Sequence, residues 1–405
     1  MNDRISALVS RVLAPKRLAQ LVRRHRARAA LCAALAVAIA LVSWDLSSGS
    51  SPVAAPTRPV TTPPATGPAP AAPAVPTPGG AAPGSGAYDA LTCSTAASCF
   101  AVGAGASGAG IAASSANGGG SWRALNVPAQ TPELDAITCR DASNCLAVGS
   151  TSSLVTSNGG ATWTLAQVTT TPTTLLGVAC SSTTTCVTSG VATHVGEPDA
   201  GALYVTNDGG SSWTAVALPT ATPGLGAVAC PTPTRCIAVG DTVLVSDDGG
   251  QTWQSKAVNG GMGSLRSISC PTALFCYALG PNALGGVDSG APGNAIITTD
   301  GGDTWQHADL PNGSASIEQV SCGGQNSCEA VGPSATSSTA PTFLSTGNQG
   351  STWSPATIPS GMTAIAAIAC PATTHCAAVG RSASGIATAV TTDGKTWAVT
   401  ATAVS

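Results

Sequence analysis

The chain has 405 residues, which is enough for more than one ordinary domain or for one long repeat architecture. Charged residues make up 9 % and aromatic residues 3 % of the sequence, whereas glycine (47) and proline (29) are abundant, a composition that favours short strands and turns over long helices. Residues 1–45 hold eight Lys/Arg and two acids, while residues 46–405 hold eight Lys/Arg and seventeen acids, which argues against nucleic acid binding by the acidic body.

The N-terminal segment joins a basic tail, residues 1–28, to an uncharged apolar run, residues 29–44. A helix of that length spans roughly 24 Å, between a signal-peptide core and a full membrane span. Two interpretations fit: an uncleaved transmembrane helix, which we favour, or a cleaved signal that leaves a secreted protein. In both, the arginines hold the N-terminus in the cytoplasm and the rest of the chain lies outside the membrane.

Residues 45–87 are rich in proline, alanine and threonine, with eleven prolines between Pro52 and Pro83. Such a composition cannot bury a core and favours extended polyproline geometry. The segment is predicted to be a disordered linker that could reach on the order of 100 Å.

From Tyr88 onward the chain repeats one unit seven times. Each unit has an apolar strand that ends in cysteine, then five residues, then a second cysteine that opens another strand, as in ITCRDASNCLAVG. The 318 residues from 88 to 405 give about 45 per unit, the size of a four-stranded propeller blade. The predicted fold is all-β, a seven-bladed β-propeller over 88–405.

The cysteine pairs have one uniform spacing, C-x5-C. Structural zinc sites usually use C-x2–4-C pairs assembled in fours, so seven identical pairs on an exported chain indicate seven local disulfides and no metal site. The predicted bridges are Cys93–Cys99, Cys139–Cys145, Cys180–Cys186, Cys230–Cys236, Cys270–Cys276, Cys322–Cys328 and Cys370–Cys376.

Each unit also carries a glycine turn that leads to a tryptophan, such as SDDGGQTW or TNDGGSSW. These phrases resemble the Asp-box, or BNR, repeat, which lies between the third and fourth strands of a propeller blade. The seventh copy, TTDGKTW, is one residue short, which puts its turn geometry in doubt. The residues that match the box acid are Asn117, Asn158, Asp208, Asp248, Asp300, Asn348 and, in the short copy, Asp393.

The box acid is predicted to be structural. A short Asp or Asn side chain caps the backbone N–H groups of its own turn, and glycine supplies the positive φ that the turn needs. Asparagine at three of the positions fits a cap that needs an acceptor without a charge, whereas a calcium loop or an acid/base pair would not tolerate it.

In propellers of the Asp-box type, the loops from strand two to strand three and the blade-to-blade loops share the face away from the boxes, and the ligand face is expected there. His194, Glu197 and Asp199 could bind a metal, but we favour a solvated polar loop because nothing fixes their geometry. No cofactor and no catalytic residue is assigned. The candidate ligand-face residues are His194, Glu197, Asp199, Asp288, Glu133 and Glu318, with Asp135 beside them.

Two functions remain open. The resemblance extends to photosystem II stability/assembly factors and to sortilin-type receptors, which are interaction proteins, and we favour a non-catalytic scaffold that binds a protein or a cell-envelope glycan. The alternative is a secreted glycoside hydrolase or glycan-binding protein. Sialidases share the box but hold the substrate carboxylate with an arginine cluster and use a tyrosine nucleophile. Here Arg123, Arg140 and Arg235 are expected on the wrong face, and the tyrosines have no evident acidic partner. A hydrolase would therefore depend on two carboxylates, Glu197 and Asp288.

Overall fold

The computed structural model describes residues 86–193, 198–258, 263–282, 292–314, 317–332, 342–383 and 385–401. The predicted tail, apolar helix and most of the linker lie outside the described residues, as do the candidates His194, Glu197 and Asp288. The described residues form strands and turns without a helix, and so none of their elements could cross a membrane as an apolar helix.

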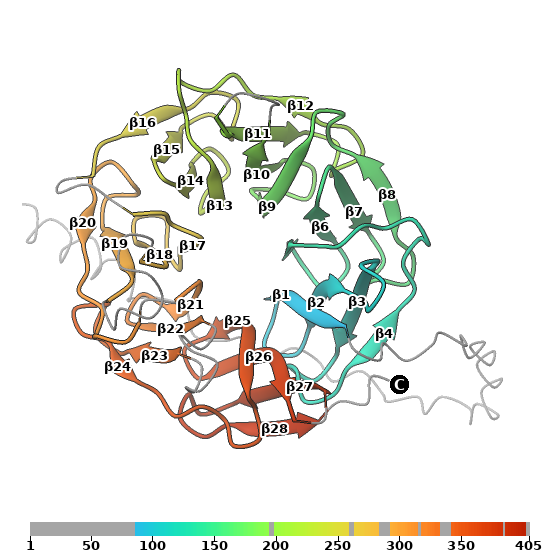
Figure 1. Cartoon of the computed structure of the whole chain (residues 1–405), viewed down its shortest axis with the longest axis vertical. Coiled ribbons are helices and arrows are strands. Elements are labelled where there is room, and N and C mark those ends of the chain that lie inside the picture. The colour runs from blue at the N-terminus through green and yellow to red at the C-terminus, as the bar shows by residue number, and fades with distance from the viewer. Residues whose placement is uncertain are drawn as a thin grey trace, which may run out of the picture. The chain divides into compact units, whose positions relative to one another are not determined.

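The described residues build seven four-stranded antiparallel sheets, each from four consecutive strands. Figure 1 shows them as the blades of a ring, and they confirm the predicted seven-bladed β-propeller. Blades one to four comprise β1 (Ala87–Cys93), β2 (Cys99–Ala104), β3 (Gly110–Ser115), β4 (Arg123–Leu125), β5 (Ala136–Cys139), β6 (Cys145–Gly149), β7 (Ser152–Thr156), β8 (Thr164–Gln167), β9 (Thr173–Cys180), β10 (Cys186–Ala192), β11 (Ala200–Thr206), β12 (Thr214–Ala215), β13 (Leu225–Ala229), β14 (Cys236–Gly240), β15 (Val243–Ser246) and β16 (Gln254–Lys256). Blades five to seven comprise β17 (Ser267–Ser269), β18 (Cys276–Gly280), β19 (Asn294–Thr298), β20 (Gln306–His307), β21 (Gln319–Gly324), β22 (Ser327–Gly332), β23 (Thr342–Thr346), β24 (Ser354–Pro355), β25 (Ala364–Ala372), β26 (His375–Ser382), β27 (Gly385–Thr391) and β28 (Ala398–Ala401).

The ring closes by packing rather than by a shared strand. Blade one is complete as β1–β4 and blade seven as β25–β28, and β1 lies against β25 and β26. Tyr88 and Trp122 of blade one pack there with Ala377 and Val379 of blade seven in one buried cluster. Each of the other apolar clusters likewise joins two neighbouring blades, so the core of this protein is its set of interblade interfaces.

All seven predicted disulfides are formed within the described residues, and each joins the first two strands of its blade. In blade two, for example, Cys139 and Cys145 are direct partners across the β5–β6 ladder. Because the bridges are local, they restrain each first hairpin without linking one blade to the next.

The Asp-box turns have the predicted capping geometry. One carboxylate oxygen of Asp248 accepts hydrogen bonds from the backbone N–H groups of Gln251 (3.0 Å) and Thr252 (2.9 Å), and the other accepts from the Thr252 hydroxyl (2.5 Å). Gly249 and Gly250 have φ values of 75° and 95°, which a residue with a side chain rarely adopts. In the short copy Asp393 still accepts from two backbone N–H groups, so that turn is capped as well.

Candidate binding site on the loop face

The Asp boxes and the first hairpins share one face of the ring. In each of five blades the first box glycine donates its N–H to a carbonyl of the first hairpin, as Gly249 does to Thr234 at 2.8 Å and Gly301 does to Leu274 at 2.8 Å. The opposite ends of the strands therefore carry the loops from strand two to strand three and the blade-to-blade loops. We call this side the loop face.

Each innermost strand begins with a bulge on the loop face. In blade two both Asp135 and Ala136 oppose Val148, and so one residue is in excess on the inner strand. The register shifts at the same place in blades one, three, four and seven. A bulge of this kind turns the extra side chain away from the sheet.

The glycine that ends the second strand is a consequence of the bulge. A Cβ at Gly149 would lie 2.0 Å from the carbonyl oxygen of Glu133, and one at Gly240 would lie 2.0 Å from that of Gly224. These distances are impossible for a real side chain, so the bulge requires glycine at the end of the sequence motif C-x-A-V-G. The glycine thus marks, in sequence, the blade in which a bulge occurs.

The bulge residues converge on the axis. They line two adjoining cavities of about 450 Å³ and 350 Å³, which share Glu318 and Gln319 and which we together call the axial mouth. Figure 1 shows the first strands β1, β9, β13, β17, β21 and β25 around this axis. The seven bulge residues are Asp89, Asp135, Leu176, Gly226, Arg266, Glu318 and Ala366.

The axial mouth is acidic. Besides the bulge residues, Asp199 and Asp241 reach it from the loops between the second and third strands of blades three and four. Arg381 joins it from blade seven. Five carboxylates therefore line the mouth against two guanidinium groups, those of Arg266 and Arg381.

The carboxylates of blades one and two perturb one another. Burial, reinforced by the charges of Glu133 and Asp89, raises the pKa of Asp135 to about 6, although a hydrogen bond from the Ser150 backbone opposes the change. Burial and Glu133 also raise the pKa of Asp89, and Arg381 opposes them. Mutual repulsion of this kind favours a bound cation, which would relieve it.

Gln319 lies at the floor of the mouth. Its side-chain amide donates to the carbonyl of Asp89 on β1 (3.3 Å), and its carbonyl accepts from the backbone N–H of Ile368 on β25 (3.4 Å). One side chain of blade six is thus bound to blades one and seven. Below it, along the axis, lies a smaller cavity of about 280 Å³ between the inner strands.

Of the sequence-predicted candidates, Asp199 and Glu318 line the mouth. Glu133 lies beside them and acts electrostatically on Asp89 and Asp135. The sequence analysis did not single out Asp89, Asp241, Arg266 or Arg381. Asp89 and Arg266 could have been found as the residues that follow the first buried apolar residue of their units, Tyr88 and Leu265.

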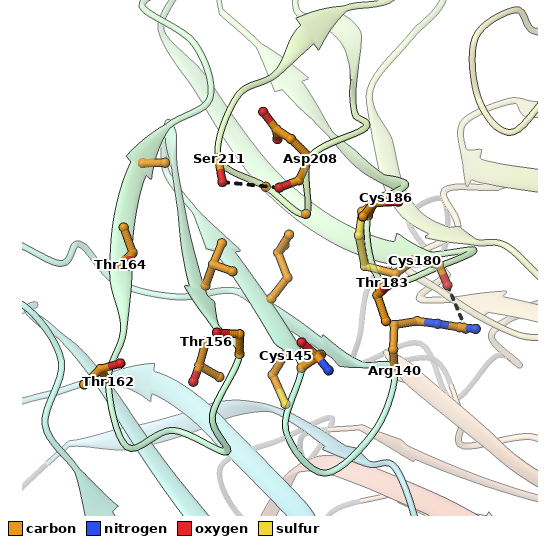
Figure 2. Close-up of a pocket in the computed structure, with 18 residues that line it drawn as sticks. Arg140, Cys145, Thr156, Thr162, Thr164, Cys180, Thr183, Cys186, Asp208 and Ser211 are labelled. Carbon is orange, nitrogen blue, oxygen red and sulfur yellow. Dashed lines mark hydrogen bonds between the residues drawn. A yellow bond between two sulfur atoms is a disulfide. The ribbon is translucent and has the colours of Figure 1, made fainter.

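A second cavity, of about 320 Å³, lies between blades two and three on the box face (Figure 2). Its two charged side chains, Arg140 and Asp208, are already engaged. A guanidinium N–H of Arg140 donates to the Cys180 carbonyl (2.9 Å), and Asp208 accepts from the Ser212 hydroxyl (2.5 Å) and the Thr206 hydroxyl (2.7 Å). This cavity therefore offers less free chemistry than the axial mouth.

The described residues provide neither a metal site nor an aromatic platform for sugars. No group of three or more His, Cys, Asp or Glu side chains in the described part could hold a metal ion. Among the described residues, the large hydrophobic side chain that is exposed is Leu274, which is aliphatic and not aromatic. The box tryptophans Trp122, Trp163, Trp253, Trp305 and Trp353 are buried.

Comparison with known proteins supports the repeat assignment. The family described as photosynthesis system II assembly factor YCF48 matches residues 114–273. A solved structure of YCF48 bound to D1 peptide aligns with a TM-score of 0.50 at 15% identity, covering 66% of this chain and 81% of that one. No curated protein matches the sequence.

Two glycoside hydrolases of family GH74 have similar folds. The enzyme from Niastella koreensis aligns with a TM-score of 0.56 at 15% identity, covering 78% of this chain and 53% of the enzyme. The xyloglucanase from Xanthomonas campestris aligns with a TM-score of 0.55 at 16% identity, covering 76% of this chain and 52% of the enzyme. This chain thus spans about half the length of either enzyme, and at such identities the likeness concerns the fold alone. The chain is a seven-bladed β-propeller of the Asp-box (BNR) type, similar to the YCF48 assembly factor.

Proposed function

We propose that the protein is a non-catalytic binding scaffold, displayed outside the membrane, whose axial mouth holds a cationic segment of a protein partner. The observation that carries the proposal is the convergence of the bulge residues on one axis. Three of them are acidic, and Asp199 and Asp241 add to their charge. A lysine or arginine side chain entering the mouth would meet carboxylates from several blades at once.

The chemistry of the described mouth favours a peptide over a glycan. Sugar-binding sites usually present exposed aromatic rings, and the residues that line the axial mouth include one buried ring, that of Tyr88. Acidic rims instead attract basic partners and increase their association rate. The similar propeller YCF48, whose solved structure contains a D1 peptide, makes a peptide ligand a reasonable class for this chain too.

Display outside the membrane rests on the sequence. A basic tail, an apolar run and a proline-rich linker precede the propeller, and seven disulfides suit an oxidising compartment. The alternative of a hydrolase depended on Glu197 and Asp288, and both lie outside the described residues.

The proposal can be tested by fluorescence anisotropy on the full chain in detergent, with a short lysine-rich peptide and its glutamate-rich counterpart as probes. The lysine-rich peptide should bind and the other should not. Changing Asp135→Asn together with Glu318→Gln should weaken binding by about 2- to 5-fold per charge removed. Binding should also weaken as salt is added, because salt screens exposed charges.

The matched control is Asp247→Asn with Asp303→Asn, which changes the net charge equally but lies on the box face, where both carboxylates pair with Arg235. Equal weakening by both double variants would overturn the proposal. Because Asp135 loses its proton as pH rises through about 6, peptide affinity should increase from pH 5 to pH 7. Asp135→Asn should reduce that increase.

A further inference from the structure

At six of the seven blade junctions, one position of a blade packs beneath the Asp box of the next blade. It is the residue that follows the second cysteine. In blade five it is Tyr277, whose ring lies 5.2 Å from that of Trp353 and whose hydroxyl accepts the indole N–H at 2.6 Å. The residues at this position are Phe100, Leu146, Val187, Ile237, Tyr277, Glu329 and Ala377.

The contact on the other side is made by the second glycine of the box. A Cβ at Gly210 would lie 2.5 Å from Leu146, one at Gly250 would lie 2.4 Å from Val187, and one at Gly350 would lie 2.2 Å from Tyr277. The space at these six junctions is therefore filled by a side chain from one blade and by bare backbone from the next.

The junction between blades six and seven departs from this pattern on both sides. Blade six contributes a glutamate, Glu329, where the other blades contribute apolar or aromatic residues. In blade seven, Gly394 corresponds to the first box glycine, because its Cβ would lie 3.1 Å from the Thr373 carbonyl of its own hairpin, as the first glycines of other boxes do. The residue that corresponds to the second glycine is missing. Two exceptions thus coincide at one interface.

Glu329 faces this interface. Residues two apart on a strand share a side of the sheet, and Val331 packs with Ile365 and Cys370 of blade seven. One carboxyl oxygen of Glu329, Oε2, is buried and has no hydrogen-bond partner. Burying a charged carboxylate without a partner is costly, whereas its neutral form can fill the space as Tyr277 does in blade five.

We propose that the junction of blades six and seven is a proton-controlled joint, closed while Glu329 is neutral and loosened when Glu329 ionises. The tryptophan of blade seven, Trp397, lacks a hydrogen bond that two of its counterparts make. Trp253 and Trp305 donate their indole N–H to the second glycine carbonyl at 2.9 Å and 3.0 Å. That glycine is missing in blade seven, where the Trp397 ring packs against the Phe343 ring of blade six at 5.6 Å.

The groups around Glu329 do not offset its charge. Its register partners Ser321 and Ser345 are uncharged. On blade seven, Asp393 and Lys395 lie on the exposed box turn. The other two charged or titratable groups of that blade lie elsewhere: the His375 ring contacts Gly118 of blade one, and Arg381 lines the axial mouth.

Burial raises the pKa of Glu329 to about 8. Because this is above the value in the unfolded chain, the native state binds the additional proton, and stability falls as pH rises from about 4 towards 8. Blade seven has no shared strand with blade one, so it is the end of the ring where a loosened junction can open.

The test is hydrogen exchange of the full chain in detergent at pH 5.5 and 8.5, corrected for the intrinsic effect of pH on exchange. In the wild type, peptides of blades six and seven should lose protection at the higher pH by about tenfold or more relative to those of blades three and four. In Glu329→Gln this relative loss should disappear. Glu318→Gln, which removes the other glutamate of blade six, should behave as wild type.

A second variant guards against misfolding of the first. Glu329→Ile places at this junction the residue that blade four has at the same position, Ile237. It should also abolish the pH-dependent loss of protection. The proposal fails if the wild type shows no additional exchange in blades six and seven at pH 8.5. It also fails if that exchange persists in both variants.

Discussion

At the scale of single residues, the Asp-box acid is a cap. Asn158 accepts a hydrogen bond from the Thr162 backbone N–H (2.9 Å) and donates one to its hydroxyl (2.8 Å), so it holds its turn as Asp248 holds its own. Asp247, the acid that precedes Asp248, pairs with Arg235, which also donates to the Gly301 carbonyl of the next blade. The two adjacent carboxylates of SDDGGQTW are therefore both structural.

Replacing this cap tests the assignment. Asp248→Ala removes the acceptor for two backbone N–H groups and should lower the free energy of unfolding by about 1–2 kcal/mol. Asp248→Asn should cost only a small part of that, because asparagine supports the same turn at residue 158. Chemical denaturation of both variants measures the difference. Equal losses would mean that the charge, rather than the acceptor, stabilises the turn.

At the scale of the element, each blade is held by its first hairpin and by its contacts with two neighbours. The repeated apolar strands, the cysteine spacing and the glycine turns all predicted the blade correctly, because each is a local pattern that recurs. The bulge was missed, although the glycine of C-x-A-V-G signals it, because the clash that requires this glycine involves a strand about fifteen residues away in sequence, as with Gly149 and Glu133.

The disulfide of blade seven should contribute more to stability than the others. A disulfide stabilises the folded protein by lowering the entropy of the unfolded chain. For so short a loop the gain is about 2 kcal/mol, which corresponds to roughly 3 °C in melting temperature for a domain of this size. Cys370→Ser with Cys376→Ser should lower the melting temperature by more than Cys230→Ser with Cys236→Ser. The reason is that blade seven forms the closing interface with blade one, whereas blade four lies between blades three and five, to which the chain joins it directly. An unchanged melting temperature in the blade-seven variant would contradict this expectation.

At the scale of the whole molecule, stability should pass through a maximum on the acid side of neutrality. Hydrogen bonds in the box turns lower the pKa of Asp208 and Asp300 to about 2, so the stability they contribute is present above about pH 4 and is lost as pH falls towards 2. The pKa values of Asp135 and Glu329 are raised, to about 6 and about 8. The native state therefore binds their protons more tightly than the unfolded chain does, and the stability that this contributes is lost as pH rises above about 4.

Melting temperatures measured from pH 2.5 to pH 9 should therefore peak near pH 4 to 5 and decline on both sides. Glu329→Gln should flatten the decline between pH 6 and 8, and Asp208→Asn should flatten the decline below pH 4. A wild-type protein that is equally stable from pH 5 to pH 8 would show that neither raised carboxyl stays buried in solution.

The sequence by itself determined what is local and repeated: seven units, four strands in each, a disulfide in every first hairpin, and a capped turn before the tryptophan of every unit. Those features depend on hydrogen bonds and contacts between residues close in the chain, and one unit confirms the next. Only the tertiary structure decided which residues meet on the axis, because Asp89 and Glu318 come together through closure of the ring rather than through any pattern in the chain. The same holds for Glu329, whose Oε2 is buried without a hydrogen-bond partner, which no pattern in the sequence indicates.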